Sequence, residues 1–248
     1  MSDWLDPLRA ALDQTDATTT WFFRDDDAGW DDARLFALLN CFAEFNTPID
    51  LAVIPTELTD ELAAALLKRR QQNPNLLGLH QHGYGHTNHE VVGRKCEFGL
   101  SRSLAQQSHD IERGGALLRA KLGDAIDPIF TPPWNRCTSA TIASLQSLNF
   151  SALSRDVTAA PLDTDNLIEI SVNVDWSKRQ NGVEINREIL AINMAAASQL
   201  SCVGVMLHHA VMAAEDLTAL RQCLELLSRH RTVQRLPMAA LITTTTQA

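Results

Sequence analysis

Four of the eight histidines in this chain lie within ten residues, His80–His89, in the segment LHQHGYGHTNH. Neutral imidazole is the commonest metal-binding side chain. His82 and His86 are four residues apart, a spacing that lets both rings reach one ion from a turn or a short helix. The pair therefore predicts a metal site.

A second group of polar residues lies upstream, where the apolar run Trp21–Phe23 is followed by Arg24 and three consecutive carboxylates, Asp25, Asp26 and Asp27. Two histidines and one carboxylate make three protein ligands and leave further coordination positions open. That donor set is typical of a catalytic metal rather than a structural one.

The composition limits the classes of function. The chain has 248 residues and a formal net charge of −9, with acidic and basic residues interspersed, which argues against a nucleic-acid partner held by phosphate contacts. The sequence contains no apolar run of about 18 residues, so we expect no transmembrane helix. Met1–Ala11 lacks the pattern of a secretory signal, and the five cysteines are scattered without a CxxC pair, so we expect a cytoplasmic protein with reduced thiols. The sequence does not specify an oligomeric state.

Strand-length apolar runs alternate with helical patterns along the chain. We expect strands at 18–24, 49–54, 76–80, 126–131, 150–153, 167–176 and 203–207. Helices are expected at 31–45, 59–72, 101–121, 138–148, 187–200 and 217–229, and the threonine run at 243–246 as a short tail. About seven such units predict a parallel α/β sheet closed, or nearly closed, into a (β/α) barrel, as a single domain over 1–248.

The polar candidates follow the apolar part of five expected strands. They are Asp25–Asp27, His80 with His82, Pro132–Asn135, Asp175 with Trp176, and His208 with His209. In a barrel, the carboxyl ends of the strands form the active-site face. The five groups are therefore expected to meet at one pocket.

The ordered series Asp-Asp, His-x-x-x-His, Pro-Pro-Trp, Asp-Trp and Leu-His, spanning Phe22 to Ala210, resembles the polysaccharide deacetylase family. That family is also called the NodB-homology or carbohydrate esterase 4 family. The resemblance implies a distorted (β/α) barrel, often seven-stranded. It also implies removal of acetyl groups from N-acetylated sugars with a divalent metal, commonly zinc.

The first two motifs carry the expected metal site. The resemblance implies Asp26 as the general base and Asp27 as the metal ligand, together with His82 and His86. The additional Asp25 leaves a register slip of one residue open. His80 remains an alternative ligand because it shares a strand face with His82.

Two positions depart from the family pattern. Gly83 stands where the second motif has a serine or threonine, so a hydrogen bond that stabilises the loop is expected to be lost. The third motif, similar to Thr131–Trp134, lacks the arginine that orients the base. Arg24 or Arg136 would have to replace it.

The remaining motifs imply the acid and the substrate contacts. Leu207-His208 is similar to the fifth motif, which makes His208 the expected general acid in preference to His209. Asp175 is expected to hold its imidazole, and a backbone N–H near Trp134 to stabilise the oxyanion. The expected substrate-binding residues are Trp134, Trp176 and Arg24.

The expected function is a metal-dependent hydrolase that removes an acetyl or similar acyl group from an N-acetylated carbohydrate or a related small amide. An amidohydrolase-type barrel, which uses a pair such as His80-Gln81-His82, is one alternative. A non-catalytic carbohydrate-binding protein on a degenerate scaffold is another. The role of His89 is left open.

Overall fold

A parallel sheet forms the centre of the protein. The computed structural model describes residues 3–177 and 183–245. The strands follow the order β6-β5-β4-β3-β2-β1-β8-β7, and β9 pairs with β1. They are β1 (Thr19–Ala28), β2 (Ile49–Val53), β3 (Leu77–His82), β4 (Ile129–Thr131), β5 (Ala152–Leu153), β6 (Ile168–Glu169), β7 (Val174–Asp175), β8 (Cys202–Leu207) and β9 (Val233–Arg235). This curled parallel sheet confirms the expected α/β barrel-like fold.

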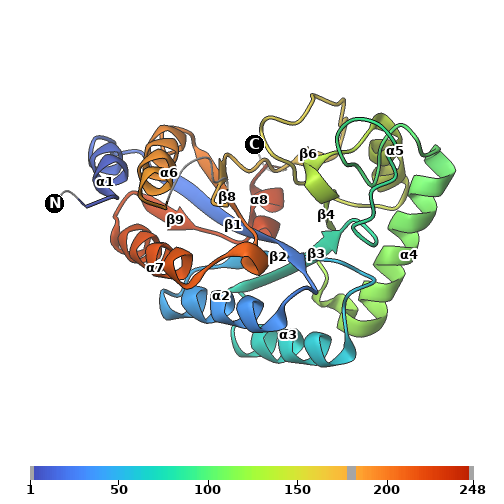
Figure 1. Cartoon of the computed structure of the whole chain (residues 1–248), viewed down its shortest axis with the longest axis horizontal. Helices are drawn as coiled ribbons and strands as arrows, with labels where there is room; N and C mark the ends of the chain where they lie inside the picture. The colour runs from blue at the N-terminus through green and yellow to red at the C-terminus, as the bar shows by residue number, and fades with distance from the viewer. Residues whose placement is uncertain (1–2, 178–182, 246–248) are drawn as a thin grey trace.

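Helices cover the outside of the sheet, with α2, α3, α4 and α7 along one side (Figure 1). They are α1 (Asp6–Asp13), α2 (Asp32–Glu44), α3 (Asp60–Gln72), α4 (Leu104–Leu122), α5 (Ser139–Ser147), α6 (Val183–Ala197), α7 (Ala214–Arg229) and α8 (Met238–Thr245). Within the described residues, no helix is long and apolar enough to cross a membrane.

Local sequence signals fix several helix starts. The Thr59 hydroxyl accepts the backbone N–H of Leu62 at the start of α3, as expected for an N-cap. The helix expected from residue 101 begins at Leu104 instead. Ser103 and Gln106 form a capping box there, so the helix starts where its first N–H groups gain partners.

Alternation along β1 divides the core into an outer and an inner part. Trp21 and Phe23 pack outward among the helices, whereas Phe22 faces the barrel interior with Met206 and Met238. Met238 begins α8, and its backbone N–H is accepted by Asp50 Oδ2. Asp50 lies near the start of β2, so α8 packs at the end of the barrel away from the strand ends that carry the expected site.

Three element predictions were wrong in part. The single strand expected at 167–176 is split into β6 and β7, because β6 pairs with β5 and β7 pairs with β8 at the opposite edge of the sheet. The first strand continues to Ala28, since Asp25 pairs with both β2 and β8 and Ala28 pairs with Val53 of β2. The expected C-terminal tail is helical through Thr245.

Candidate active site

The end of β1 turns two consecutive carboxylates toward the same side of the sheet. In a regular strand, Asp26 and Asp27 would point to opposite faces. Here the pairing with β2 shifts register between Asp25 and Ala28, and Asp27 has a left-handed φ of 68°. This bulge re-aims Asp27, while Asp25 stays on the outer face. The sequence gives no direct signal for the bulge.

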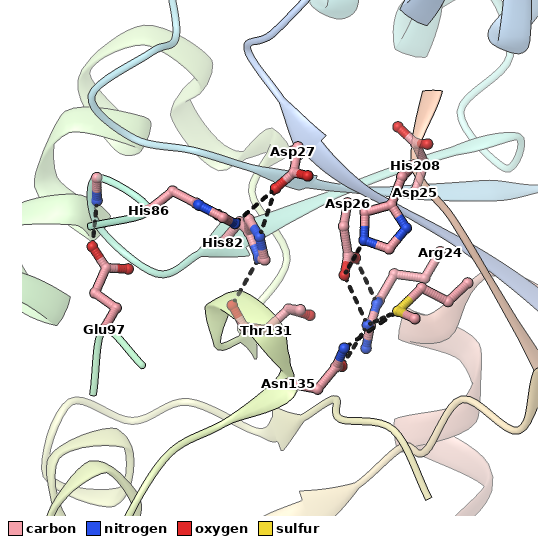
Figure 2. A network of polar contacts seen from close by, with 12 residues as sticks. Arg24, Asp25, Asp26, Asp27, His82, His86, Glu97, Thr131, Asn135 and His208 are labelled. Carbon is pink, nitrogen blue, oxygen red and sulfur yellow. Dashed lines mark hydrogen bonds and ion pairs between the residues drawn. The ribbon is translucent and has the colours of Figure 1, made fainter. Parts of the chain in front are cut away.

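Asp27, His82 and His86 meet at the strand ends (Figure 2). Asp27 Oδ1 lies 3.2 Å from His82 Nε2 and 3.1 Å from His86 Nε2. One ligand atom from each residue lies within 4.8 Å of the other two. One carboxylate oxygen and two imidazole nitrogens at this separation suit a divalent metal such as zinc. The residues present therefore fit the metal that the resemblance implies.

The second ring nitrogen of His82 fixes its orientation. Nδ1 lies 3.0 Å from the Thr131 carbonyl, to which it donates, so Nε2 is left to face Asp27. Burial alone would raise the pKa of the Asp27 carboxyl, but hydrogen bonds from His82 and His86 outweigh burial and hold that pKa well below its usual range. Asp27 is thus ionised at neutral pH, as a metal ligand must be.

Arg24 binds the Asp26 carboxylate through two hydrogen bonds. Its Nε donates to Asp26 Oδ1 at 2.8 Å and its Nη2 to Oδ2 at 3.0 Å. The same guanidinium donates to Ser154 and Asn135. Burial would raise the pKa of Asp26, but Arg24 and the nearby His82 and His208 outweigh burial and lower it.

This geometry changes the expected role of Arg24. The side chain is completely buried, and its donors are engaged by protein groups, so it orients Asp26 rather than binding substrate. Of the two replacements considered for the missing arginine, Arg24 contacts Asp26, the residue expected to be the base. Arg136 instead donates to the carbonyl of Lys95.

The two histidines after β8 occupy different environments. His208 Nε2 lies 4.0 Å from Asp26 Oδ2, and its ring is part-exposed. His209 is buried, with Nδ1 2.6 Å from Asp25 Oδ2 and Nε2 2.5 Å from the Trp30 carbonyl. Burial would lower the pKa of His209, but the Asp25 carboxylate outweighs burial and raises it to about 9. His209 therefore links the ends of β1 and β8 inside the protein, whereas His208 lies beside Asp26 and remains partly accessible to solvent.

Asp175, which was expected to hold the His208 imidazole, does not bond the Nδ1 nitrogen of that ring. Within residues 3–177 and 183–245, His208 Nδ1 has no hydrogen-bond partner. Asp175 Oδ1 accepts the backbone N–H of Ser177. Asp175 ends β7, and it lines a neighbouring cleft with Trp134 and Asn135.

The other two histidines of the cluster lie outside the three-residue group. His80 is fully buried, and its Nε2 lies 2.9 Å from the Thr131 hydroxyl. Burial lowers the pKa of His80 to about 3, so this ring is neutral and structural. His89 Nε2 lies 3.2 Å from Arg102 Nη1.

Two tryptophans flank the site, but only one of them was expected. The ring centres of Trp134 and Trp30 lie 4.4 Å and 4.8 Å from the ring centre of His86. Trp30 carried no signal in the sequence beyond its nearness to the aspartates. Trp176 was expected to bind substrate and is instead buried in the main core. It shares the outer face of the sheet with Val174, two residues before it, and its ring lies edge-on to that of Trp4, with 6.4 Å between the ring centres.

Glu97 organises the loop that carries His86, and sequence reasoning missed it. Its buried carboxylate accepts the backbone N–H groups of Tyr84, Gly85 and Thr87 at 2.9–3.2 Å. Figure 2 shows Glu97 with one of these contacts. A carboxylate with three such donors stabilises the local backbone strongly. Glu97 thus supplies the loop support whose loss was expected from Gly83.

Gly83 is required where the family pattern has a hydroxyl residue. Its φ is +55°, and an added Cβ would overlap Glu97 Oε2 and lie 2.6 Å from Pro133 Cδ. We expect Gly83→Ser to lower the free energy of unfolding by about 3 kcal/mol, from left-handed strain plus overpacking. Urea unfolding of the metal-free protein measures this loss.

Gly93→Ser is the matched control for that substitution, since Gly93 has φ +89° and nothing lies within 4 Å of its added Cβ. The control should show only the smaller conformational cost. Equal losses at the two positions would show that Glu97 and Pro133 do not make Gly83 necessary.

Comparison with known proteins identifies the fold. No protein-family model matches the sequence, and no curated protein matches it. Among solved structures, a proposed polysaccharide deacetylase from Mycobacterium smegmatis is similar, with a TM-score of 0.70 and 15% identity over 94% of this chain and 92% of that one. A family 4 acetyl xylan esterase from Clostridium thermocellum, in complex with a cobalt ion, has a TM-score of 0.60 at 13% identity, with 92% of each chain covered.

A third similar structure shows that the shared fold does not by itself establish activity. It is a mutant, with restored enzymatic activity, of a pseudoenzyme of the carbohydrate esterase 4 family. The TM-score is 0.58 at 12% identity, over 92% of this chain and 68% of that one. The chain therefore has the fold of these esterases and deacetylases. Because that fold occurs with and without activity, the function must be argued from the site itself.

Proposed function

We propose that this chain is a single catalytic domain that removes an acetyl or similar acyl group from the nitrogen of an N-acetylated carbohydrate. The observation that carries the proposal is the meeting of two groups at the carboxyl end of the sheet. Asp27, His82 and His86 offer a ligand set for a divalent metal, and Asp26 lies beside them, held by Arg24. The neighbours named as deacetylase and esterase support the same reaction class.

A divalent metal held by Asp27, His82 and His86 would polarise the acyl carbonyl and lower the pKa of water. Asp26 then accepts a proton from the attacking water. Its lowered pKa keeps it ionised at neutral pH, and the two N–H groups of Arg24 fix the carboxylate plane, so the base is preorganised.

His208 and Trp134 complete the proposed site. His208 lies beside Asp26, on the side away from His82 and His86 (Figure 2), where its Nε2 can give a proton to the leaving nitrogen. Trp134 lies against His86 with φ 57°, a strained conformation of the kind found at functional sites. We propose that its ring packs on a sugar ring and that its backbone N–H stabilises the oxyanion.

The two alternative functions lose the observations that motivated them. The amidohydrolase reading needs His80 as a ligand, but His80 Nε2 is engaged by Thr131. The non-catalytic reading relied on the missing arginine of the third motif, and Arg24 makes that contact with Asp26. The deacetylase hypothesis is compatible with both observations, because it needs neither His80 as a ligand nor an arginine in the third motif.

The proposal is tested by acetate release. We expect chelator-treated protein to release no acetate from N-acetylglucosamine oligomers and zinc-reloaded protein to release it, since activity needs the ion. Cobalt reloading is a second arm, chosen because a neighbour was solved with cobalt. Release that is unchanged by the chelator would contradict a metal-dependent mechanism.

His208→Ala tests the proposed acid. An acetamide leaves as an amine that must be protonated, whereas an activated aryl ester leaves as a stable anion. We therefore expect amide hydrolysis to fall by about 10²-fold or more and ester hydrolysis much less. Equal losses on both substrates, with the zinc content unchanged, would remove His208 from that role.

A further inference from the structure

A cleft of about 440 Å³ adjoins the proposed active site. Trp134 and Asn135 belong to both, since Trp134 packs on His86 and Asn135 accepts a hydrogen bond from Arg24. The volume lies in the range of small-ligand sites. A substrate bound at Asp26 could therefore extend into this cleft without leaving the protein surface.

Two arginines line the cleft, and a lysine lies over the ring of one of its lining residues. Arg94 and Arg136 line it, and Lys95 Nζ lies 6.0 Å from the centre of the Trp134 ring. Arg136 Nη1 donates to the Lys95 carbonyl, which fixes its position. Burial and the neighbouring Arg94 lower the pKa of the Arg136 guanidinium, so the two arginines are close enough to repel each other.

These three cations have no carboxylate partner among the described residues, although the chain carries a net charge of −9. Two carboxylates, Asp156 and Asp175, also line the cleft, and both accept hydrogen bonds from protein groups. Asp175 Oδ1 accepts the backbone N–H of Ser177. Asp156 accepts the backbone N–H and the hydroxyl of Thr158 at 2.7 Å and 2.6 Å. The fourth cation, Arg155, is paired with Glu169 at 2.7 Å.

We propose that Arg94, Lys95 and Arg136 bind an anionic group, a carboxylate, sulfate or phosphate ester, on the sugar next to the N-acetylated one. Guanidinium groups match such oxyanions with paired N–H donors, and the lysine adds a point charge. The inference rests on the proposed function for the saccharide nature of the ligand. It adds that the substrate is an acidic rather than a neutral glycan.

Calorimetric titration with three tetrasaccharides tests the proposal. They are an N-acetylglucosamine tetramer, a tetramer that alternates N-acetylglucosamine with glucuronate, and a 6-phosphorylated N-acetylglucosamine tetramer. The titrated protein is the zinc-reloaded Asp26→Asn variant of the whole chain, because this substitution prevents hydrolysis of the ligand during the titration. We expect the Kd of at least one anionic tetramer to be about tenfold lower than that of the neutral one. The better-bound anion distinguishes carboxylate from phosphate recognition.

Arg94→Gln/Arg136→Gln should abolish that preference and leave the Kd of the neutral tetramer unchanged, which also shows that the variant is folded. Arg94→Gln alone, at an exposed position, should reduce the preference in part. Arg231→Gln, an exposed arginine paired with Asp16, is the charge-matched control and should keep it.

The outcomes separate the two proposals. A preference that is absent, or that survives in the double variant, overturns the anionic subsite, even where the parent protein releases acetate. A preference that needs both arginines supports the subsite, even where no acetate is released and the proposed deacetylation fails.

Discussion

Asp26→Asn is expected to abolish acetate release while the protein keeps its metal. The asparagine has nearly the same shape, but its amide cannot take a proton from water. Because general base catalysis contributes about 10²–10⁴-fold, we expect kcat to fall by about 10³-fold. Single-turnover acetate release from the zinc-reloaded protein measures the loss.

The substitution also removes the charge that faces Arg24, so thermal unfolding must show that the variant is folded at the assay temperature. Asp16→Asn, at a carboxylate of the same type that pairs with exposed Arg231, is the matched control and should retain full activity. Activity of Asp26→Asn within a few-fold of the parent protein would exclude Asp26 as the base.

His82→Ala/His86→Ala is expected to lose both the metal and the activity. Two of the three ligand atoms disappear, and a lone carboxylate does not hold zinc against desalting. We expect zinc to fall from about one per chain to near zero, with acetate release below detection. Elemental analysis after chelation, reloading and desalting measures the metal.

His89→Ala/His109→Ala removes the same number of histidines from the neighbouring loop and from α4. Neither residue belongs to the three-ligand group, so this control should retain its zinc. Equal zinc content in the two double variants would place the metal elsewhere in the chain.

The parallel strands were largely predictable because apolar runs of strand length are a local pattern. The carboxyl ends of those strands predicted that the aspartate and histidine clusters would meet, and the family resemblance singled out Asp27 with His82 and His86. The split of 167–176 was not predictable, since each half pairs with a strand far away in the chain.

The residues that position the site were not predictable from the sequence, because they contact residues far away in the chain or bind backbone groups. Arg24 and Asn135 are 111 residues apart, and their hydrogen bond follows only from the closed sheet. Glu97 binds backbone N–H groups, which leave no trace in side-chain spacing. Trp176 was misplaced because a position after a strand end does not reveal which way the side chain turns.

The proposed roles of Asp26 and Asp27 depend on the bulge at the end of β1, which separates the proposed ligand from the proposed base. The measurement that tests them most directly is the zinc content of Asp26→Asn and Asp27→Asn, reloaded and desalted side by side. We predict about one zinc per chain for Asp26→Asn and a large loss for Asp27→Asn, because only Asp27 lies within ligand distance of His82 and His86. Zinc lost from Asp26→Asn and retained by Asp27→Asn would contradict the assignment.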